Sequence, residues 1–291
     1  LSNPNDYVLL QTDLPDGSVN ESGSTGEEID FTDNEFLIHG FDDITSTVTN
    51  TDNIGTTGDL SYSGSSSHAG VTGKLGNGHI TGGNTKLSSS ASTDFNGDSD
   101  ELSYGGWFYK TGTAGNGRIL DKPMTSHTSP YYDWFLQDTG NWLMCEIGYS
   151  NPTSATFPSV STNTWYHVVC VLDDTDLKLY VDGNLETTTS VADTLVGYNS
   201  PFYIGSLGNV GGNYWSGTHD EVFIFDRAIS SDEVSSLYNG GSGARVDTLS
   251  AEGLVAYYDF DSDTTNQAPT TYQQTENALA DKSTNTWYHV V

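Results

Sequence analysis

The sequence predicts an all-β fold built from antiparallel sheets, and two observations predict it. The first is a run of three strands joined by short turns between Ser161 and Glu186. The second is composition: Gly, Ser, Thr, Asn and Asp are abundant, and these residues favour the turns that antiparallel sheets need. With 291 residues, the chain can form one large β domain with arms or two smaller domains.

The run from Ser161 to Glu186 is predicted to be an antiparallel meander. Residues 164–172 are β-branched and aromatic, which suits a half-buried strand. A polar turn follows at 173–176, and then apolar and polar residues alternate through 177–182, as in a strand with one buried face. Asp182-Gly183 can adopt the positive φ of a tight hairpin, so the third strand begins near residue 185.

Further strands and one short helix are predicted on both sides of this meander. The strands fall at 36–43, 71–83, 102–109, 131–147 (a hairpin that turns at 138–140), 202–205 and 215–225. Ser230 and Glu233 have the spacing of a capping box, which predicts a helix start. Asn239-Gly240 predicts the helix end.

Several of these segments resemble one family. TWYHVVCVLDDTDLKLYVDGNL (164–185) is similar to the centre of LamG-like domains, of the laminin-G and concanavalin A-like superfamily. The segments at 36–43 and 215–238 resemble the family's opening and closing segments. The resemblance implies a jelly-roll sandwich of two antiparallel sheets over residues 36–241. An acidic N-terminal arm (1–35) would precede it and a C-terminal extension (242–291) would follow.

The C-terminal extension repeats earlier parts of the chain. LVAYYDFD (254–261) looks like a second opening strand, and STNTWYHVV (283–291) repeats residues 161–169 letter for letter. We interpret the extension as the start of a truncated or misassembled second repeat. The alternative is a strand that pairs with a sheet edge of a neighbouring subunit.

The charge of the chain limits its partners. Lys and Arg number 9 and Asp and Glu 39, so the net charge is −30. Such a surface repels phosphate backbones and anionic headgroups, which argues against nucleic acid and membrane partners, and it suits divalent cations. No apolar run approaches the ~20 residues of a membrane span.

The two cysteines, Cys145 and Cys170, both fall in predicted strands. They can form a disulfide if those strands are neighbours, and otherwise they are buried free thiols.

A structural calcium site is implied by the family resemblance. Related jelly rolls often join the acidic loop after the first strand to an Asp at the start of the last strand. The matching residues are Asp42, Asp43 and Asp220. Carboxylates at rigid turns are the ligands that calcium prefers. The alternative is that Asp220 caps a turn and that Glu221 is surface-exposed.

Glycan binding would need exposed aromatic side chains, and Tyr214 and Trp215 are the best candidates. They lie in a Gly-rich stretch at 208–217, which is predicted to be a loop. Loops commonly carry binding residues. The other aromatic residues in and just after the predicted hairpin at 131–147 are expected mostly in the core: Tyr131, Tyr132, Trp134, Trp142 and Tyr149.

An enzyme of the glucanase type is weakly supported. Glu28, Asp30 and Glu35 resemble the carboxylate motif of β-glucanases, but Glu35 is on the opposite strand face from Glu28 and the segment precedes the domain. We therefore predict a non-catalytic extracellular module. It would act in adhesion or assembly on a virion fibre or cell-surface filament, with self-association and no catalytic residues. A secreted carbohydrate-binding protein is the second hypothesis, and a glycoside hydrolase is the third.

Overall fold

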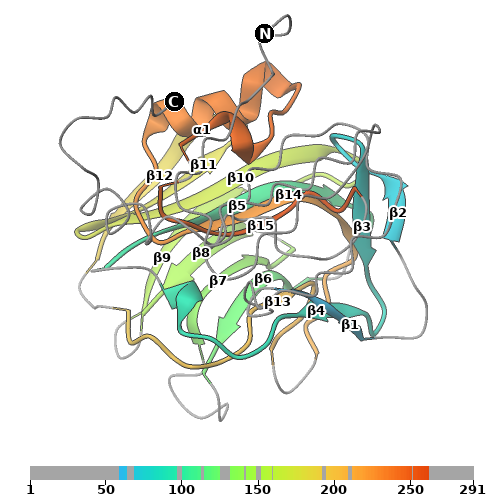
Figure 1. The fold of residues 1–291 in the computed structure, drawn as a ribbon, viewed down its shortest axis with the longest axis horizontal. Helices are drawn as coiled ribbons and strands as arrows, with labels where there is room; N and C mark the ends of the chain where they lie inside the picture. The colour runs from blue at the N-terminus through green and yellow to red at the C-terminus, as the bar shows by residue number, and fades with distance from the viewer. Residues whose placement is uncertain are drawn as a thin grey trace, which may run out of the picture. The chain divides into compact units, whose positions relative to one another are not determined.

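Two antiparallel sheets form the jelly-roll sandwich that the sequence predicts (Figure 1). The computed structural model describes residues 59–63, 69–96, 100–112, 115–124, 132–140, 142–148, 152–158, 160–191, 195–208, 212–250 and 252–261. The predicted N-terminal arm, the opening strand at 36–43 and the duplicated segment at 283–291 lie outside these residues.

The first sheet has seven strands. In spatial order they are β1 (Ser61–Ser63), β4 (Lys86–Ser88), β13 (Tyr203–Ile204), β6 (Gly117–Pro123), β7 (Tyr132–Asp138), β8 (Trp142–Ile147) and β9 (Thr153–Pro158). All of its neighbouring strands are antiparallel.

The second sheet has eight strands. Seven follow in the order β12 (Asn184–Ser190), β11 (Asp176–Val181), β10 (Trp165–Asp173), β5 (Glu101–Lys110), β14 (Gly217–Phe225), β3 (Asn77–Thr81) and β2 (Ala69–Thr72). The eighth, β15 (Leu254–Tyr258), pairs with β14. The sequence placed these residues in a C-terminal extension that begins a second repeat, whereas the structure places them in this sheet.

The predicted meander is confirmed as β10, β11 and β12. Leu177 and Leu179 point into the core. Asp176 and Lys178, which alternate with them at the start of β11, are partly exposed. Asp182 and Gly183 both have positive φ, 49° and 76°, as the tight hairpin requires.

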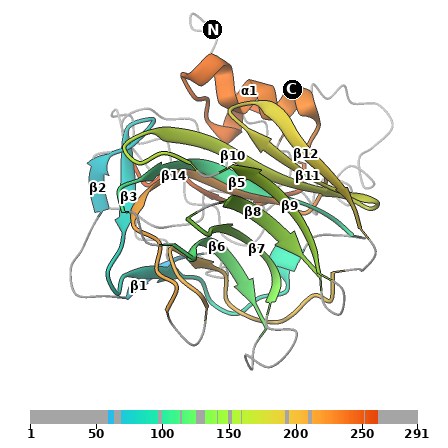
Figure 2. The same cartoon turned by 180° about the vertical axis from the view of Figure 1, so that it is seen from behind.

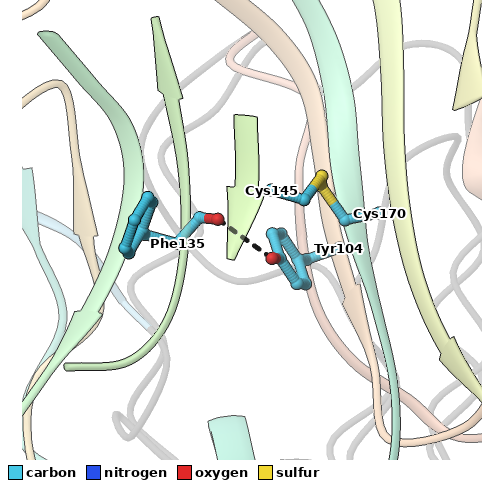
Figure 3. The surroundings of a disulfide bond; sticks show 4 residues. All are labelled: Tyr104, Phe135, Cys145 and Cys170. Atoms are coloured by element: carbon cyan, nitrogen blue, oxygen red, sulfur yellow. Dashed lines mark hydrogen bonds between the residues drawn. A yellow bond between two sulfur atoms is a disulfide. The ribbon is translucent and has the colours of Figure 1, made fainter. Parts of the chain in front are cut away.

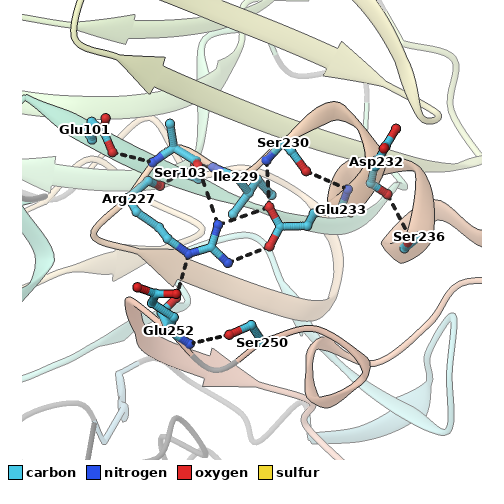
Figure 4. Close-up of polar contacts among 11 residues, drawn as sticks. Glu101, Ser103, Arg227, Ile229, Ser230, Asp232, Glu233, Ser236, Ser250 and Glu252 are labelled. Carbon is cyan, nitrogen blue, oxygen red and sulfur yellow. Dashed lines mark hydrogen bonds and ion pairs between the residues drawn. The ribbon is translucent and has the colours of Figure 1, made fainter. Parts of the chain in front are cut away.

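The helix α1 (Ser231–Tyr238) packs on the outer face of the eight-stranded sheet (Figure 2). Its predicted capping box is confirmed, because Ser230 and Glu233 each accept the other's backbone N–H. Arg227 pairs with Glu233, which fixes the helix start against the strand end (Figure 4). Asn239 ends the helix in the left-handed conformation.

Three short 3-10 turns complete the described elements: η1 (Asp94–Asn96), η2 (Asn239–Gly241) and η3 (Val246–Thr248). No helix among the described residues is long and apolar enough to cross a membrane.

The main core lies between the two sheets and is fastened by a disulfide. Cys145 of β8 and Cys170 of β10 are bonded, with their Cα atoms 6.1 Å apart (Figure 3). Beside them, Tyr104 of β5 stacks on Trp134 at 4.3 Å and donates its hydroxyl to the carbonyl of Phe135. One covalent bond and one buried hydrogen bond therefore link the sheets at the same place. The sequence left the choice between disulfide and free thiols open.

Replacing both cysteines with alanine is expected to lower the free energy of unfolding by about 2–4 kcal/mol, because the bond closes a 25-residue separation and restrains the unfolded chain. Urea denaturation of the oxidised protein and of the double variant measures the difference. A reductant should destabilise the wild type by a similar amount and leave the double variant unchanged. An unchanged wild-type midpoint after complete reduction would contradict this account.

Candidate functional site

The two outer faces of the sandwich differ in what covers them. In the eight-stranded sheet, Val169, Val171 and Phe223 are buried under α1 and η3. The short helical turn η1 does not cover an outer face, because its Phe95 lies in the core between the sheets. In the described part of the chain, no helix packs on the outer face of the seven-stranded sheet (Figures 1 and 2). We call this surface the open face.

Strand β8 presents Trp142, Met144 and Glu146 on the open face, because its alternate residues Leu143, Cys145 and Ile147 point into the core. The Trp142 side chain is 51% exposed. Most aromatic rings of the described residues are buried, so this exposure is unusual for so large a side chain. An exposed Trp offers a large apolar surface and one N–H donor, which suits a partly apolar, partly polar ligand.

Strand β6 contributes a buried charged pair, Arg118 and Asp121. Three residues apart in a regular strand, they would point to opposite faces. The register of β6 with β7 shifts between Arg118 and Leu120, and this bulge at Ile119 brings both charged residues to the open face. The guanidinium of Arg118 lies over the Phe135 ring, with Cζ 3.2 Å from its centroid. Burial raises the pKa of Asp121 to about 6.

Glu146 of β8 is also on the open face and is held by two hydroxyl groups. Tyr132 donates to its Oε1 and Ser154 donates to its Oε2. Burial and this carboxylate together raise the pKa of the Tyr132 hydroxyl, so Tyr132 remains a donor. Glu146 is therefore a fixed, hydrogen-bonded group.

The predicted metal ligand Asp220 is buried and holds a backbone turn. Its Oδ2 accepts the N–H groups of Lys74 and Leu75 at 2.6 and 2.8 Å. Asp261 binds the same turn through the N–H of Asn77 at 2.6 Å. Burial raises the pKa of Asp220 to about 7, although these N–H groups oppose the shift. These contacts match the alternative expectation, in which Asp220 caps a turn.

The structure does not describe the other two residues of the predicted calcium site. Asp42 and Asp43 are outside the described residues. Among the described residues, no group of three or more His, Cys, Asp or Glu side chains could hold a metal ion. Glu221, expected at the surface, is 2% exposed and accepts the hydroxyl of Tyr257. The calcium site stays a prediction.

Comparison with known families agrees with this architecture. A family model described as the concanavalin A-like lectin/glucanases superfamily matches residues 81–235, more than half of the chain. The chain belongs to this superfamily. No curated relative matches the chain by sequence.

Two solved structures resemble this superfamily member. Domain 4 of AbnA, an extracellular arabinanase from Geobacillus stearothermophilus, in complex with arabinotriose, has 17% identity and a TM-score of 0.52, covering 64% of this chain and 90% of that chain. The second is a structure of botulinum neurotoxin type C, whose cell entry depends on two ganglioside molecules. It has 16% identity and a TM-score of 0.47, over 62% of this chain. The match spans only 46% of the neurotoxin chain. At these identities the likeness concerns the fold.

The structure separates the two predicted ligand-binding residues of this superfamily member. Trp215 is 2% exposed and belongs to the core, so the prediction that it binds ligand from a loop is corrected. Tyr214 is half-buried, and its backbone forms a bridge with Arg118 beside the open face. Trp142, which was expected in the core, is the exposed ring. The predicted carboxylate motif at Glu28, Asp30 and Glu35 lies outside the described residues.

Proposed function

We propose that this chain is a non-catalytic glycan-binding module and that the glycan lies on the open face. The observation that carries the proposal is Trp142, whose side chain is exposed on a sheet face that no described helix covers. A planar aromatic ring can pack against the apolar face of a sugar while polar neighbours bind its hydroxyl groups.

Two facts about similar proteins support the proposal. The superfamily includes lectins, and the arabinanase domain that shares the fold is in complex with arabinotriose.

We also propose an extracellular location, because a buried disulfide suits an oxidising compartment. Self-association, a place in a virion fibre or cell-surface filament, and a calcium ion bound by Asp220 with Asp42 or Asp43 stay predictions. Light scattering with and without a chelator is the measurement that bears on them.

The proposal is tested with an array of neutral and acidic oligosaccharides that includes arabinotriose. We expect the wild type to bind one glycan class, and Trp142→Ala to weaken that binding at least ~10-fold. Leu185→Ala is the matched control, because Leu185 is also 51% exposed but lies on β12 of the other sheet. The control should bind like the wild type. Absence of glycan binding by the wild type, or equal binding by the two variants, would overturn the proposal.

A further inference from the structure

Lys110 of β5 and Asp138 of β7 form a buried ion pair between the two sheets. Lys110 alternates with the core residues Tyr104 and Phe108 on the inner side of β5. Asp138 alternates in the same way with Leu136 on β7. The Nζ atom of Lys110 is 2.7 Å from Oδ2 of Asp138, and the two side chains are 6% and 0% exposed. The pair therefore crosses from one sheet to the other where water has little access.

The contact between the two groups is close, yet it is not a hydrogen bond. Asp138 Oδ2 has no hydrogen-bond partner in the described part of the chain, although Nζ of Lys110 lies 2.7 Å away. The angles of the contact therefore lie outside those of a hydrogen bond. Lys122, the other buried lysine of the described residues, differs because its ammonium donates to three carbonyl oxygens. A buried ion pair is stable only with good geometry and further hydrogen bonds, and the Lys110 pair lacks that geometry.

The carboxyl group of Asp138 is held so that its two oxygen atoms differ. Oδ1 accepts the N–H of Gly140 at 2.8 Å. This N–H fixes the carboxyl plane and can stabilise negative charge on Oδ1 when a nucleophile adds to Cγ. Oδ2 faces the nitrogen of Lys110. The site thus combines an amine, a carboxyl carbon and a donor for the developing oxyanion.

We propose that Lys110 and Asp138 condense to an isopeptide bond, which makes this pair a covalent modification site. A proton passes from the ammonium to Oδ2, and the lone pair of Nζ attacks Cγ. The bond between Nζ and Cγ forms, the bond between Cγ and Oδ2 breaks, and Oδ2 leaves as water with a second proton from the nitrogen. One ammonium and one carboxylate become one neutral amide and one water, so no oxidant or other reactant is needed. The amide removes two charges from the space between the sheets, where charges are costly to bury.

The isopeptide bond joins a different pair of strands from the disulfide. The disulfide links β8 to β10, whereas Lys110 and Asp138 link β5 to β7. Because β5 pairs with β10 and β7 pairs with β8, the two bonds connect the same two pairs of neighbouring strands. An amide is not cleaved by thiol reductants, so one covalent link between the sheets persists when the disulfide is reduced. This inference is independent of glycan binding.

The first experiment measures the intact mass of the full chain after reduction and alkylation in denaturant. We expect most molecules to be lighter than the mass calculated from the alkylated sequence by one water, about 18 Da. After trypsin cleaves behind Arg118, the peptides 87–118 and 119–178 should remain joined through the side chains of Lys110 and Asp138. A mass equal to the calculated one in most molecules would overturn the proposal. This measurement needs no variant to fold.

The second experiment assigns the loss of water to the pair. Lys110→Arg keeps the positive charge but removes the amine, and Asp138→Ala removes the carboxyl group. Both variants should have their full calculated mass and release the two peptides separately. Lys86→Arg is the matched control, because it removes an amine from β4 and should keep the mass deficit. A deficit that persists in both pair variants would place the water loss elsewhere, such as in a succinimide at an Asn-Gly sequence, and would refute the isopeptide bond.

Discussion

Replacing Lys122 with methionine is expected to lower the free energy of unfolding by about 3–5 kcal/mol. Lys122 is fully buried, and its ammonium donates to the carbonyl oxygens of Ser92, Tyr198 and Ser200 at 2.9, 2.7 and 2.7 Å. The Ser200 hydroxyl oxygen, 2.9 Å from the ammonium, shares one of its three N–H donors. Methionine fills a similar volume and donates nothing, so four acceptors lose a charged donor in a region with little access to water. Equilibrium urea denaturation measures the loss.

The charge state of Lys122 is consistent with this role. Burial lowers its pKa to about 8, while the nearby carboxylates of Asp133 and Asp94 oppose the shift. The ammonium form therefore dominates at neutral pH, where the measurement is made. Lys178→Met is the matched control, because Lys178 is partly exposed and pairs with Asp173 at the surface. Such pairs contribute about 1 kcal/mol or less. Equal losses for the two variants would contradict the structural role of Lys122.

Turns and caps could be predicted from the sequence because they depend on neighbouring residues. Asp182-Gly183 and the Ser230–Glu233 capping box adopt the predicted conformations. The strands of the meander were also predictable, since alternation with a period of two is local. The family resemblance then supplied the architecture that no single element determines.

The candidate site depends on pairings between distant segments, which local patterns do not contain. A regular strand would separate Arg118 from Asp121, and only the bulge opposite β7 brings them together. Alternation groups Trp142 with Met144 and Glu146 but does not say whether that face meets the core or solvent. The place of β15 follows from its pairing with β14, which lies nearly thirty residues away in the chain.

Trp215 shows how a loop-like sequence can hide a core residue. Its indole packs edge-on against Phe108 at 6.3 Å and against His219 at 4.8 Å between ring centroids. A Cβ added to Gly217 would lie 2.3 Å from Trp215 Cη2, and one added to Gly117 would lie 2.9 Å from its Cβ. Gly217, one of the glycines that suggest an exposed loop, thus makes room for the ring together with Gly117 of β6.

Replacing Trp215 with alanine is therefore expected to lower the free energy of unfolding by about 3–5 kcal/mol, because the change leaves a large cavity in the inter-sheet core. Tyr214→Ala is the matched control: its half-buried ring is the neighbouring side chain, and its removal should cost about 1 kcal/mol or less. Urea denaturation of both variants gives the two losses. If Trp215 were a ligand-binding aromatic on a loop, its removal would leave stability nearly unchanged and abolish glycan binding. A folded Trp215→Ala protein with wild-type stability would refute its assignment to the core.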